Sequence, residues 1–237
     1  MWNNPEETAR HQRVLELFLT AKVVSNRNIR FKSDLEAAKE RYIKKHGCID
    51  RTTGDMKSHS FVLQFLQNIE SVMAKTIAAD SDAVSIVDTG GTARSINTYT
   101  FFGSGNSRNC YGLYSWEAPA TITTYGILAG TGTTAPAAND NAMETLIAHG
   151  VGSGQLYYGG TGTAGTVVSG SNCDLTISRL LGNTSGGTIT IREVGLAVGM
   201  QGGSSTYYYF LQAHDAVNQA VANGETAIIL YTLRTTV

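Results

Sequence analysis

His214 and Asp215 are the neighbouring residues whose types most directly suggest chemistry. An imidazole beside a carboxylate belongs to the Ser-His-Asp triad, but that triad also needs an activated nucleophile and an oxyanion hole. The sequence contains no Gly-x-Ser-x-Gly turn, and no serine or cysteine is marked as a nucleophile by its neighbours. The remaining histidines lack the spacing of a zinc site; they are His11, His46, His59 and His149. We therefore predict no catalytic residue, no metal ligand and structural roles for the histidines.

Glycine spacing raises the question of a nucleotide cofactor. Residues 160–165 fit Gly-x-Gly-x-x-Gly, but this fingerprint works only where a strand turns into a helix, and here a strand is expected to follow. Residues 130–135 come closer, yet Pro136 and several polar residues separate them from the next expected helix. The sequence also lacks the Gly-Lys-Ser/Thr of a phosphate-binding loop. We predict no bound cofactor.

Two polar groups in expected strands have alternative interpretations. Arg192 and Glu193 form either an ordinary exposed pair or a partly buried ion pair or subunit contact that fixes the strand register. The residues Tyr207, Tyr208 and Tyr209 could form a platform on which a sugar stacks. Alternating aromatic residues on a strand more often place one side in the core and the other in an interface, and we favour that interpretation.

The cysteines and the N-terminus bear on the compartment. Cys48, Cys110 and Cys173 form no Cys-x-x-Cys pair, so they predict neither a zinc ribbon nor a disulfide framework but buried or incidental thiols. The first ten residues lack the basic and apolar regions of a secretion signal. No run approaches the ~20 apolar residues of a membrane helix. We expect folding in a cytosol without a membrane partner, and we interpret the sequon at 183–185 as a turn.

The composition of the chain changes near residue 80. Residues 1–80 hold 13 of the 18 lysines and arginines, whereas residues 81–237 hold 24 of the 26 glycines and no lysine. Neither part has the strong basic excess of a nucleic-acid-binding protein. We predict an α+β, mainly β, protein of two domains. Residues 1–80 are expected to be a helical docking or anchoring segment, and residues 81–237 an antiparallel β-sandwich with one short inserted helix.

The first part is expected to contain three helices. Apolar residues at three- and four-residue spacing predict the longest over 61–77. Ser33 and Glu36 form a capping box that opens a helix ending at Gly47. A further helix is expected over 7–19, although its apolar residues do not fix one face. These stripes must pack against the β body, against each other or against another subunit.

Alternating apolar residues between Gly, Asn and Ser turns predict strands in the second part. They are expected near 94–102, 121–129, 155–159, 165–169, 173–180, 187–199, 206–214 and 225–235. Gly186-Gly187 is expected to close a hairpin, and Asn223-Gly224 to form a type I′ turn. A short helix is expected over 141–150, with Asn141 and Glu144 as its capping box.

The apolar residues of one strand change parity. They are Ile189, Ile191, Val194, Leu196 and Val198. One extra residue at Arg192-Glu193 would keep all five on one side of the sheet, so we predict a β-bulge at that pair. A strand buried on both faces is the alternative.

Three stretches of the second part resemble structural proteins of tailed bacteriophages. They are GILAGTGTTAPAANDNAMETLIAHG from Gly126, ISRLLGNTSGGTITIREVGLAV from Ile177 and NGETAIILYTLRTT from Asn223. The pattern is similar to the β module of tail-collar and fibre-attachment proteins and spans about 125–237. The resemblance implies an adaptor or collar element rather than a long receptor-binding fibre.

Composition and resemblance together predict a non-enzymatic virion protein of the neck, collar or tail that anchors fibres. Desolvating lysines at repeated contacts would be costly, so a lysine-free β body suits self-association in a symmetric homo-oligomer. The expected partners are other tail, neck or fibre proteins and copies of the chain itself, in a virion assembled in the host cytoplasm, with no specific nucleic acid. The alternatives are a head-decoration protein, a carbohydrate-binding module and a hydrolase.

Overall fold

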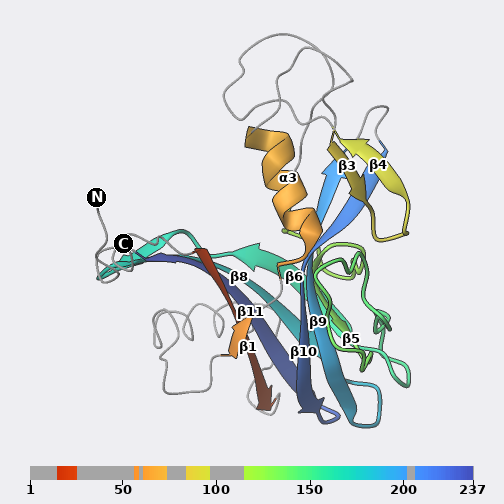
Figure 1. Ribbon diagram of the computed structural model, residues 1–237. Coiled ribbons are helices and arrows are strands. Elements are labelled where there is room, and N and C mark those ends of the chain that lie inside the picture. The colour runs from red at the N-terminus through yellow and green to blue at the C-terminus, as the bar shows by residue number, and fades with distance from the viewer. Residues whose placement is uncertain are drawn as a thin grey trace.

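The computed structural model describes residues 15–25, 56–58, 61–73, 84–96, 115–201 and 206–236. This part of the chain is mainly β, with antiparallel sheets and one helix (Figure 1). Within these ranges no helix is long and apolar enough to cross a membrane.

The largest sheet contains six strands in the order β2-β1-β11-β8-β6, with β7 also paired to β8. The strands are β1 (Leu15–Ser25), β2 (Met56–Ser58), β6 (Tyr157–Thr163), β7 (Val167–Ser169), β8 (Asn172–Gly182) and β11 (Glu225–Thr236). Every pairing is antiparallel, and β11 lies at the centre between β1 and β8.

A second sheet has the order β10-β9-β5, and a hairpin of two strands stands apart from it. These strands are β3 (Val84–Val87), β4 (Ala93–Ile96), β5 (Gly126–Gly130), β9 (Ile189–Gln201) and β10 (Tyr207–Val221). Pairing of β3 with β4 and of β9 with β5 and β10 is again antiparallel.

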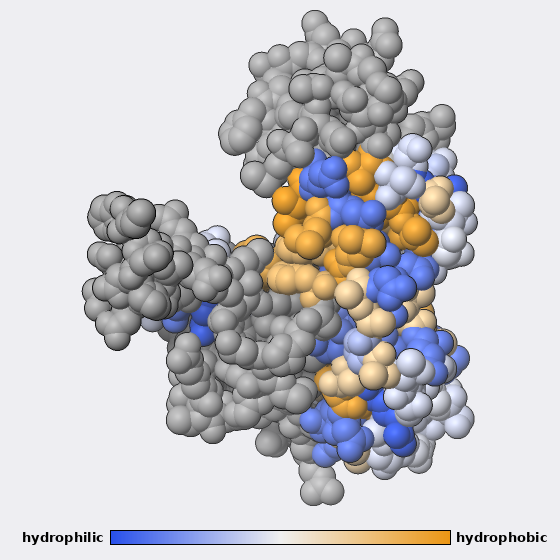
Figure 2. Space-filling model, viewed as in Figure 1, coloured by the Kyte–Doolittle hydropathy of each residue, from blue (hydrophilic) through white to orange (hydrophobic). Residues whose placement is uncertain are grey.

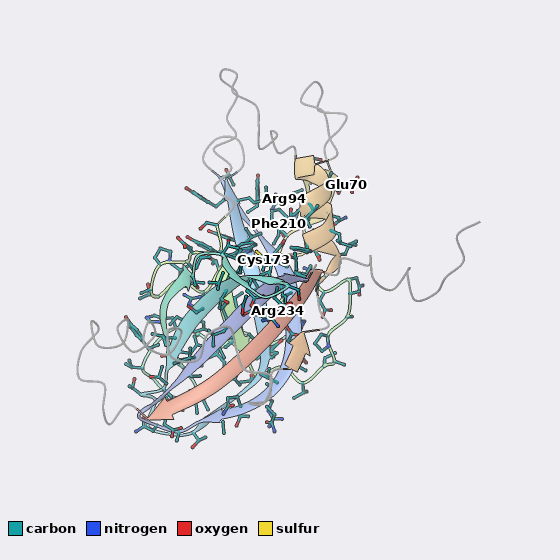
Figure 3. The ribbon with its side chains drawn as sticks, turned by 90° about the vertical axis from the view of Figure 1, so that its left-hand side faces the viewer. Glu70, Arg94, Cys173, Phe210 and Arg234 are labelled. Carbon is teal, nitrogen blue, oxygen red and sulfur yellow. The ribbon has the colours of Figure 1, made fainter. Side chains whose placement is uncertain are left out.

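The two larger sheets share one apolar core. Ile127 of β5 and Leu196 of β9 belong to the same buried cluster as Ile177 of β8 and Ile229 of β11. Each is at most 1% exposed, so each contributes roughly 1.5–3 kcal/mol through burial of its side chain. A second cluster joins the β3–β4 hairpin to β9 and β10, with Ile86 and Phe210 at its centre. Figure 3 shows Phe210 at the end of the molecule where the helix lies.

The helix α3 (Leu63–Met73) contacts β3 and β10 (Figure 1). It confirms the predicted helix over 61–77 as far as the described residues extend. The N–H of Val62 bonds to the carbonyl of Gln212 at 3.0 Å, and Phe61 forms an isolated bridge with Ala213. These bonds fix the point where the chain enters the helix against the edge of β10.

Two expectations for the first 80 residues need correction or fall outside the described chain. The helix over 7–19 is wrong in its second half, because residues 15–25 form β1 and pair with β11 along their whole length. The alternation Leu15, Leu17, Leu19 and the β-branched pair at 23–24 favour a strand, and pairing with a central strand outweighs helix propensity. The helix expected over 33–47 lies outside the described residues. The domain boundary near residue 80 stays a prediction, although β1 and α3 both pack on later elements.

The short helix expected over 141–150 is absent from the structure. Leu146 forms a bridge with Gly130, and His149 forms one with Leu156, so this segment lies beside β5 and β6 as irregular chain. The Glu144 carboxylate accepts the N–H groups of Thr133 and Thr134 at 2.6 and 2.8 Å instead of capping a helix. The N–H groups of Glu144 and Thr145, which lie inside the expected helix, donate to the Glu193 carboxylate instead of to helix carbonyls.

Two predicted turns are also wrong in type. Gly186-Gly187 does not close a hairpin, because β8 and β9 belong to different sheets. The Asn223-Gly224 turn likewise connects different sheets, and only Gly224 has positive φ, at 83°, so it is not type I′. Both turns direct the chain across the core instead of reversing it within one sheet.

The predicted strands otherwise agree with β5 to β11, whereas β1, β2 and β3 were not expected. The strand expected over 94–102 corresponds to β4, and its residues beyond Ile96 lie outside the described chain. Four of the five apolar residues of β9 share the main core, namely Ile189, Ile191, Val194 and Leu196, whereas Val198 belongs to the second cluster. The predicted β-bulge at Arg192-Glu193 is wrong in its strand. The register with β10 does shift at this place, but two steps from 191 to 193 face three from 219 to 216, so the extra residue is on β10. The alternative was also partly right, since residues 193–200 are all buried.

Candidate functional site

A buried carboxylate on β9 holds the loop 131–147 against the sheet. Glu193 is 2% exposed. Its Oε1 accepts the N–H groups of Gly132 at 3.0 Å and Thr145 at 2.7 Å, and its Oε2 accepts the N–H of Glu144 at 2.9 Å. One side chain thus satisfies three backbone donors that irregular chain would otherwise leave unpaired, and buried donors without partners are costly.

A histidine and a second carboxylate extend this arrangement. His214 of β10 lies 2.9 Å from Glu193 Oε2 through Nε2 and 2.7 Å from Asp140 Oδ2 through Nδ1. Asp140 belongs to the loop, and its Oδ2 also accepts the N–H of Ala137 at 2.8 Å. We call Glu193, His214 and Asp140, with the backbone donors that they bind, the Glu193 clamp.

Glycine at two loop positions makes the clamp possible. A Cβ on Gly132 would lie 2.6 Å from Glu144 Cβ and 2.6 Å from Glu193 Oε1. A Cβ on Gly130 would also collide with the Glu193 carboxylate. The glycine spacing that resembles a nucleotide fingerprint therefore gives the backbone close access to an internal carboxylate.

The neighbouring acid Glu144 has its own role in the loop. Hydrogen bonds from the backbone and side chain of Thr134, and from the backbone of Thr133, lower the pKa of Glu144, and burial opposes them only in part. Thr133 and Thr134 themselves are exposed. The successive backbone N–H groups of residues 132–134 thus donate to the carboxylates of two different acids, Glu193 and Glu144.

A buried cation on β8 performs the opposite task for the segment 119–127. Arg179 is fully buried, and its Nε donates to the carbonyl of Gly159 at 2.8 Å. Its Nη1 donates to the carbonyls of Tyr125 and Ile127 at 3.3 and 2.8 Å. Its Nη2 donates to those of Pro119 and Ile122 at 3.4 and 2.5 Å. We call this set of carbonyls the Arg179 cage.

The electrostatics of the cage follow from burial. Burial lowers the pKa of Arg179 to about 10, and the Tyr158 and Tyr125 rings partly oppose this shift. The Arg179 guanidinium carbon lies 4.8 Å from the centre of the Tyr158 ring. Burial also raises the pKa of Tyr158 to about 12, so this phenol is neutral. Its single hydrogen can be accepted by the carbonyl of Ile147 at 2.9 Å or that of Ala129 at 3.1 Å.

Other buried polar groups are also paired within the chain. The Arg234 guanidinium binds Asp174 with two bonds of 2.6 Å between β11 and β8. Tyr231 OH donates to Asp215 Oδ2 at 2.9 Å inside the core, and burial raises the pKa of Tyr231 well above its ordinary value. The neighbours His214 and Asp215 thus point into different environments and form no dyad.

The remaining candidate residues are placed as follows. Arg192 is exposed and Glu193 is buried, so the pair is neither an ordinary exposed pair nor an ion pair between its own members.

His149 ends no helix; its Nδ1 accepts the N–H of Tyr158 at 3.2 Å. Cys173 is a free, partly buried thiol. The sequon residue Asn183 is fully buried, and its Oδ1 accepts the N–H of Ser185, as a turn requires. His11, His46, His59, Cys48 and Cys110 lie outside the described residues.

The tyrosine run at 207–209 combines with a residue that the sequence did not indicate. Tyr125 stacks on Tyr209 with ring centroids 5.7 Å apart, and Tyr207 is 49% exposed. Tyr208 lies on the other side of β10, against the second core cluster and below the Arg94 guanidinium at 4.7 Å. The alternation confirms a core side and an outer side for this run, and the expected interface on the outer side stays a prediction.

Sequence reasoning missed Arg179 and Asp140 and left Glu193 between two alternatives. The available signal was an isolated charge within each apolar strand, since such charges are rarely buried unless they are paired. Across the described ranges, no group of three metal-binding side chains is close enough to hold an ion. Comparison of the chain with family models, curated proteins and solved structures finds no match.

Proposed function

We propose that the protein is a non-enzymatic structural component of a tailed phage virion, with a β-sandwich body that assembles through its surface. Within the virion we favour a neck, collar or tail position where fibres are anchored. Its partners would be neighbouring tail, neck or fibre proteins and copies of the chain itself.

The observation that carries this proposal is the exposed apolar side of α3. Leu63 and Leu66 are 50% and 62% exposed, whereas Gln64 and Asn68 are 3% and 2% exposed. Figure 2 shows an apolar patch on the surface where α3 lies. The helix buries Phe65, which is 7% exposed, together with the two amides and leaves both leucines outside. Exposed leucines are expected at a subunit contact, because apolar side chains gain free energy when a partner covers them.

The clamp gives the resemblance a physical basis. The stretches GTGTT and AMET of the loop and REVGL of β9, which are far apart in the sequence, meet at Glu193. Residues that carry a shared pattern and also bond to one another belong to one structural unit. This supports an assembly module as the source of the pattern, because the unit holds a loop rather than a substrate.

The body surface fits the same role. Residues 81–237 contain no lysine, so a contact made by this body desolvates none of these strongly hydrated ions. A head-decoration protein would share this property and is the nearest alternative position. The exposed Tyr207 beside the Tyr125–Tyr209 stack favours a carbohydrate-binding module as a second function.

A double substitution tests the α3 contact. Leu63→Ser with Leu66→Ser should leave the free energy of unfolding within about 0.5 kcal/mol, because both leucines are largely exposed, and should abolish incorporation into particles. Val168→Ser on β7 is the matched control, since Val168 is 73% exposed and distant in sequence from α3. The measurement is the amount of protein in purified virions by mass spectrometry.

Normal incorporation of the double variant would refute the α3 contact, and absence of the wild-type chain from particles would refute the virion proposal. Glycan-array binding that Tyr207→Ala abolishes would support the carbohydrate-binding module instead.

A further inference from the structure

The Glu193 clamp is complete in only one protonation state. Glu193 accepts from three backbone N–H groups and from His214, so both its oxygens act as acceptors and a hydrogen on either would displace a donor. Asp140 Oδ2 likewise accepts from Ala137 and His214. Each ring nitrogen of His214 therefore faces a carboxylate acceptor, and both bonds form only when both nitrogens carry hydrogen.

The charged surroundings of His214 come from the elements that pack against it. The loop contributes Asp140 and Glu144, and β9 contributes Glu193. Asp215 follows His214 on β10 but is turned into the core, where it accepts from Tyr231. Among the described residues, three carboxylates therefore surround one imidazole on the loop side of the sheet. The 5% exposure of the His214 side chain keeps these interactions strong.

The clamped loop is also bonded to α3 and to the β3–β4 hairpin. The N–H of Leu63 donates to the carbonyl of Ala138 at 2.7 Å. The Asn141 side chain donates to the carbonyl of Asp88 at 3.0 Å. Ala138 and Asn141 thus lie between Ala137 and Thr145, whose N–H groups donate to the carboxylates of the clamp. A change in the clamp therefore reaches the first turn of the helix through a few covalent bonds.

We propose that loop 131–147 couples the protonation state of the Glu193 clamp to the position of α3 and of the β3–β4 hairpin against the two larger sheets. When His214 loses a ring hydrogen, or when Glu193 or Asp140 gains one, a clamp bond is lost and the loop loosens. The bond from Leu63 to Ala138 then opens more often. The clamp is thus a pH-sensitive element that sets the position of the exposed leucines of α3.

Hydrogen exchange of single amides in the full chain tests the coupling. Glu193→Gln keeps the size of the side chain but replaces one acceptor by a donor. We expect the amides of Gly132 and Thr145 to exchange roughly tenfold faster or more, as loss of hydrogen bonds to a charged group implies. The amide of Leu63 should follow them, while amides paired between β8 and β11 stay protected. Glu117→Gln, at an exposed position, is the matched control and should change none of them.

Protection of Leu63 that survives Glu193→Gln while Gly132 and Thr145 lose theirs would overturn the coupling. The ring nitrogens of His214 give an independent test by ¹⁵N NMR across a pH series. Both ring nitrogens are expected to carry hydrogen over the pH range in which the Leu63 amide is protected, and exchange at Leu63 should accelerate when one hydrogen is lost. Loss of a ring hydrogen that leaves exchange at Leu63 unchanged would also overturn the proposal. Asp140→Asn should shift the pH at which the change occurs.

Discussion

The Glu193 clamp and the Arg179 cage hold two irregular segments by opposite chemistry. A carboxylate on β9 gathers backbone N–H groups of the loop 131–147, and a guanidinium on β8 gathers backbone carbonyls of the segment 119–127. In both, one buried charge replaces the partners that a sheet or helix would supply. Both charges are therefore structural parts of the fold.

The two centres differ in how their charge is balanced. Glu193 has a counter-group in His214 and, through it, a second carboxylate. Arg179 instead donates to five main-chain carbonyls, and the Tyr158 ring lies beside its guanidinium. The bonds of the clamp therefore depend on the protonation states of three ionisable side chains. Burial lowers the pKa of Arg179 to about 10, which still leaves the cage charged at neutral pH.

The largest expected effect is a loss of stability, and it should be greater at the Arg179 cage than at the Glu193 clamp. Arg179→Met should lower the free energy of unfolding by about 3–5 kcal/mol, because it leaves several buried carbonyls without a donor. Glu193→Gln should cost less, about 2–3 kcal/mol, since the amide oxygen still accepts some of the bonds. Urea unfolding followed by circular dichroism measures both. Equal losses, or a loss below about 1 kcal/mol for Arg179→Met, would contradict the difference drawn between the centres.

A smaller effect is expected from filling the space beside the clamp. Gly132→Ala should destabilise the protein by about 1–3 kcal/mol, because the added Cβ meets Glu144 and Glu193 at 2.6 Å. Gly165→Ala is the matched control: no atom lies within 4 Å of its Cβ, and the position is exposed. The same unfolding measurement distinguishes them. A neutral Gly132→Ala would show that the clamp tolerates displacement of its backbone donors.

The smallest effect concerns an acid outside both centres. Burial raises the pKa of Asp88, but hydrogen bonds from Thr92, Arg94 and Gly90 outweigh it, so the folded value lies below the ordinary 3.8. The resulting stabilisation of the β3–β4 hairpin is fully present above pH 3.8 and is lost as the pH falls through the lower folded value. Asp88→Asn should remove this part of the acid dependence. An unchanged pH profile below 3.8 would contradict the assignment.

The sequence indicated most strands but not how they are distributed between the sheets. Periodic apolar residues located β5 to β11 and the helix α3, because burial on one side leaves a period in the chain. The turns at 186–187 and 223–224 were read as hairpins because local turn residues do not specify whether the next strand pairs with the last. The helix expected over 7–19 overlaps the start of β1 for the same reason, since the partner strand β11 is about 200 residues away in sequence.

The candidate site shows the same limit. Glycines at 130 and 132, a lone acid in β9 and a histidine in β10 were all visible, but each had an ordinary local interpretation. Their structural roles depend on contacts between residues that are far apart in the sequence. His214, for example, is 21 positions from Glu193 and 74 positions from Asp140. Spacing along the chain carries no signal for such contacts when the intervening segment is irregular.

By itself, the sequence determined that this chain is mainly β after residue 80, that its second part lacks lysine and where most strands lie. The parity change at Arg192-Glu193 was also visible in the sequence, and four of the five apolar residues that show it share the main core. Only the tertiary structure decided which strands share a sheet and what the buried charges do. Glu193 and Arg179 acquire their roles from backbone groups of distant loops, and these groups look alike in every sequence.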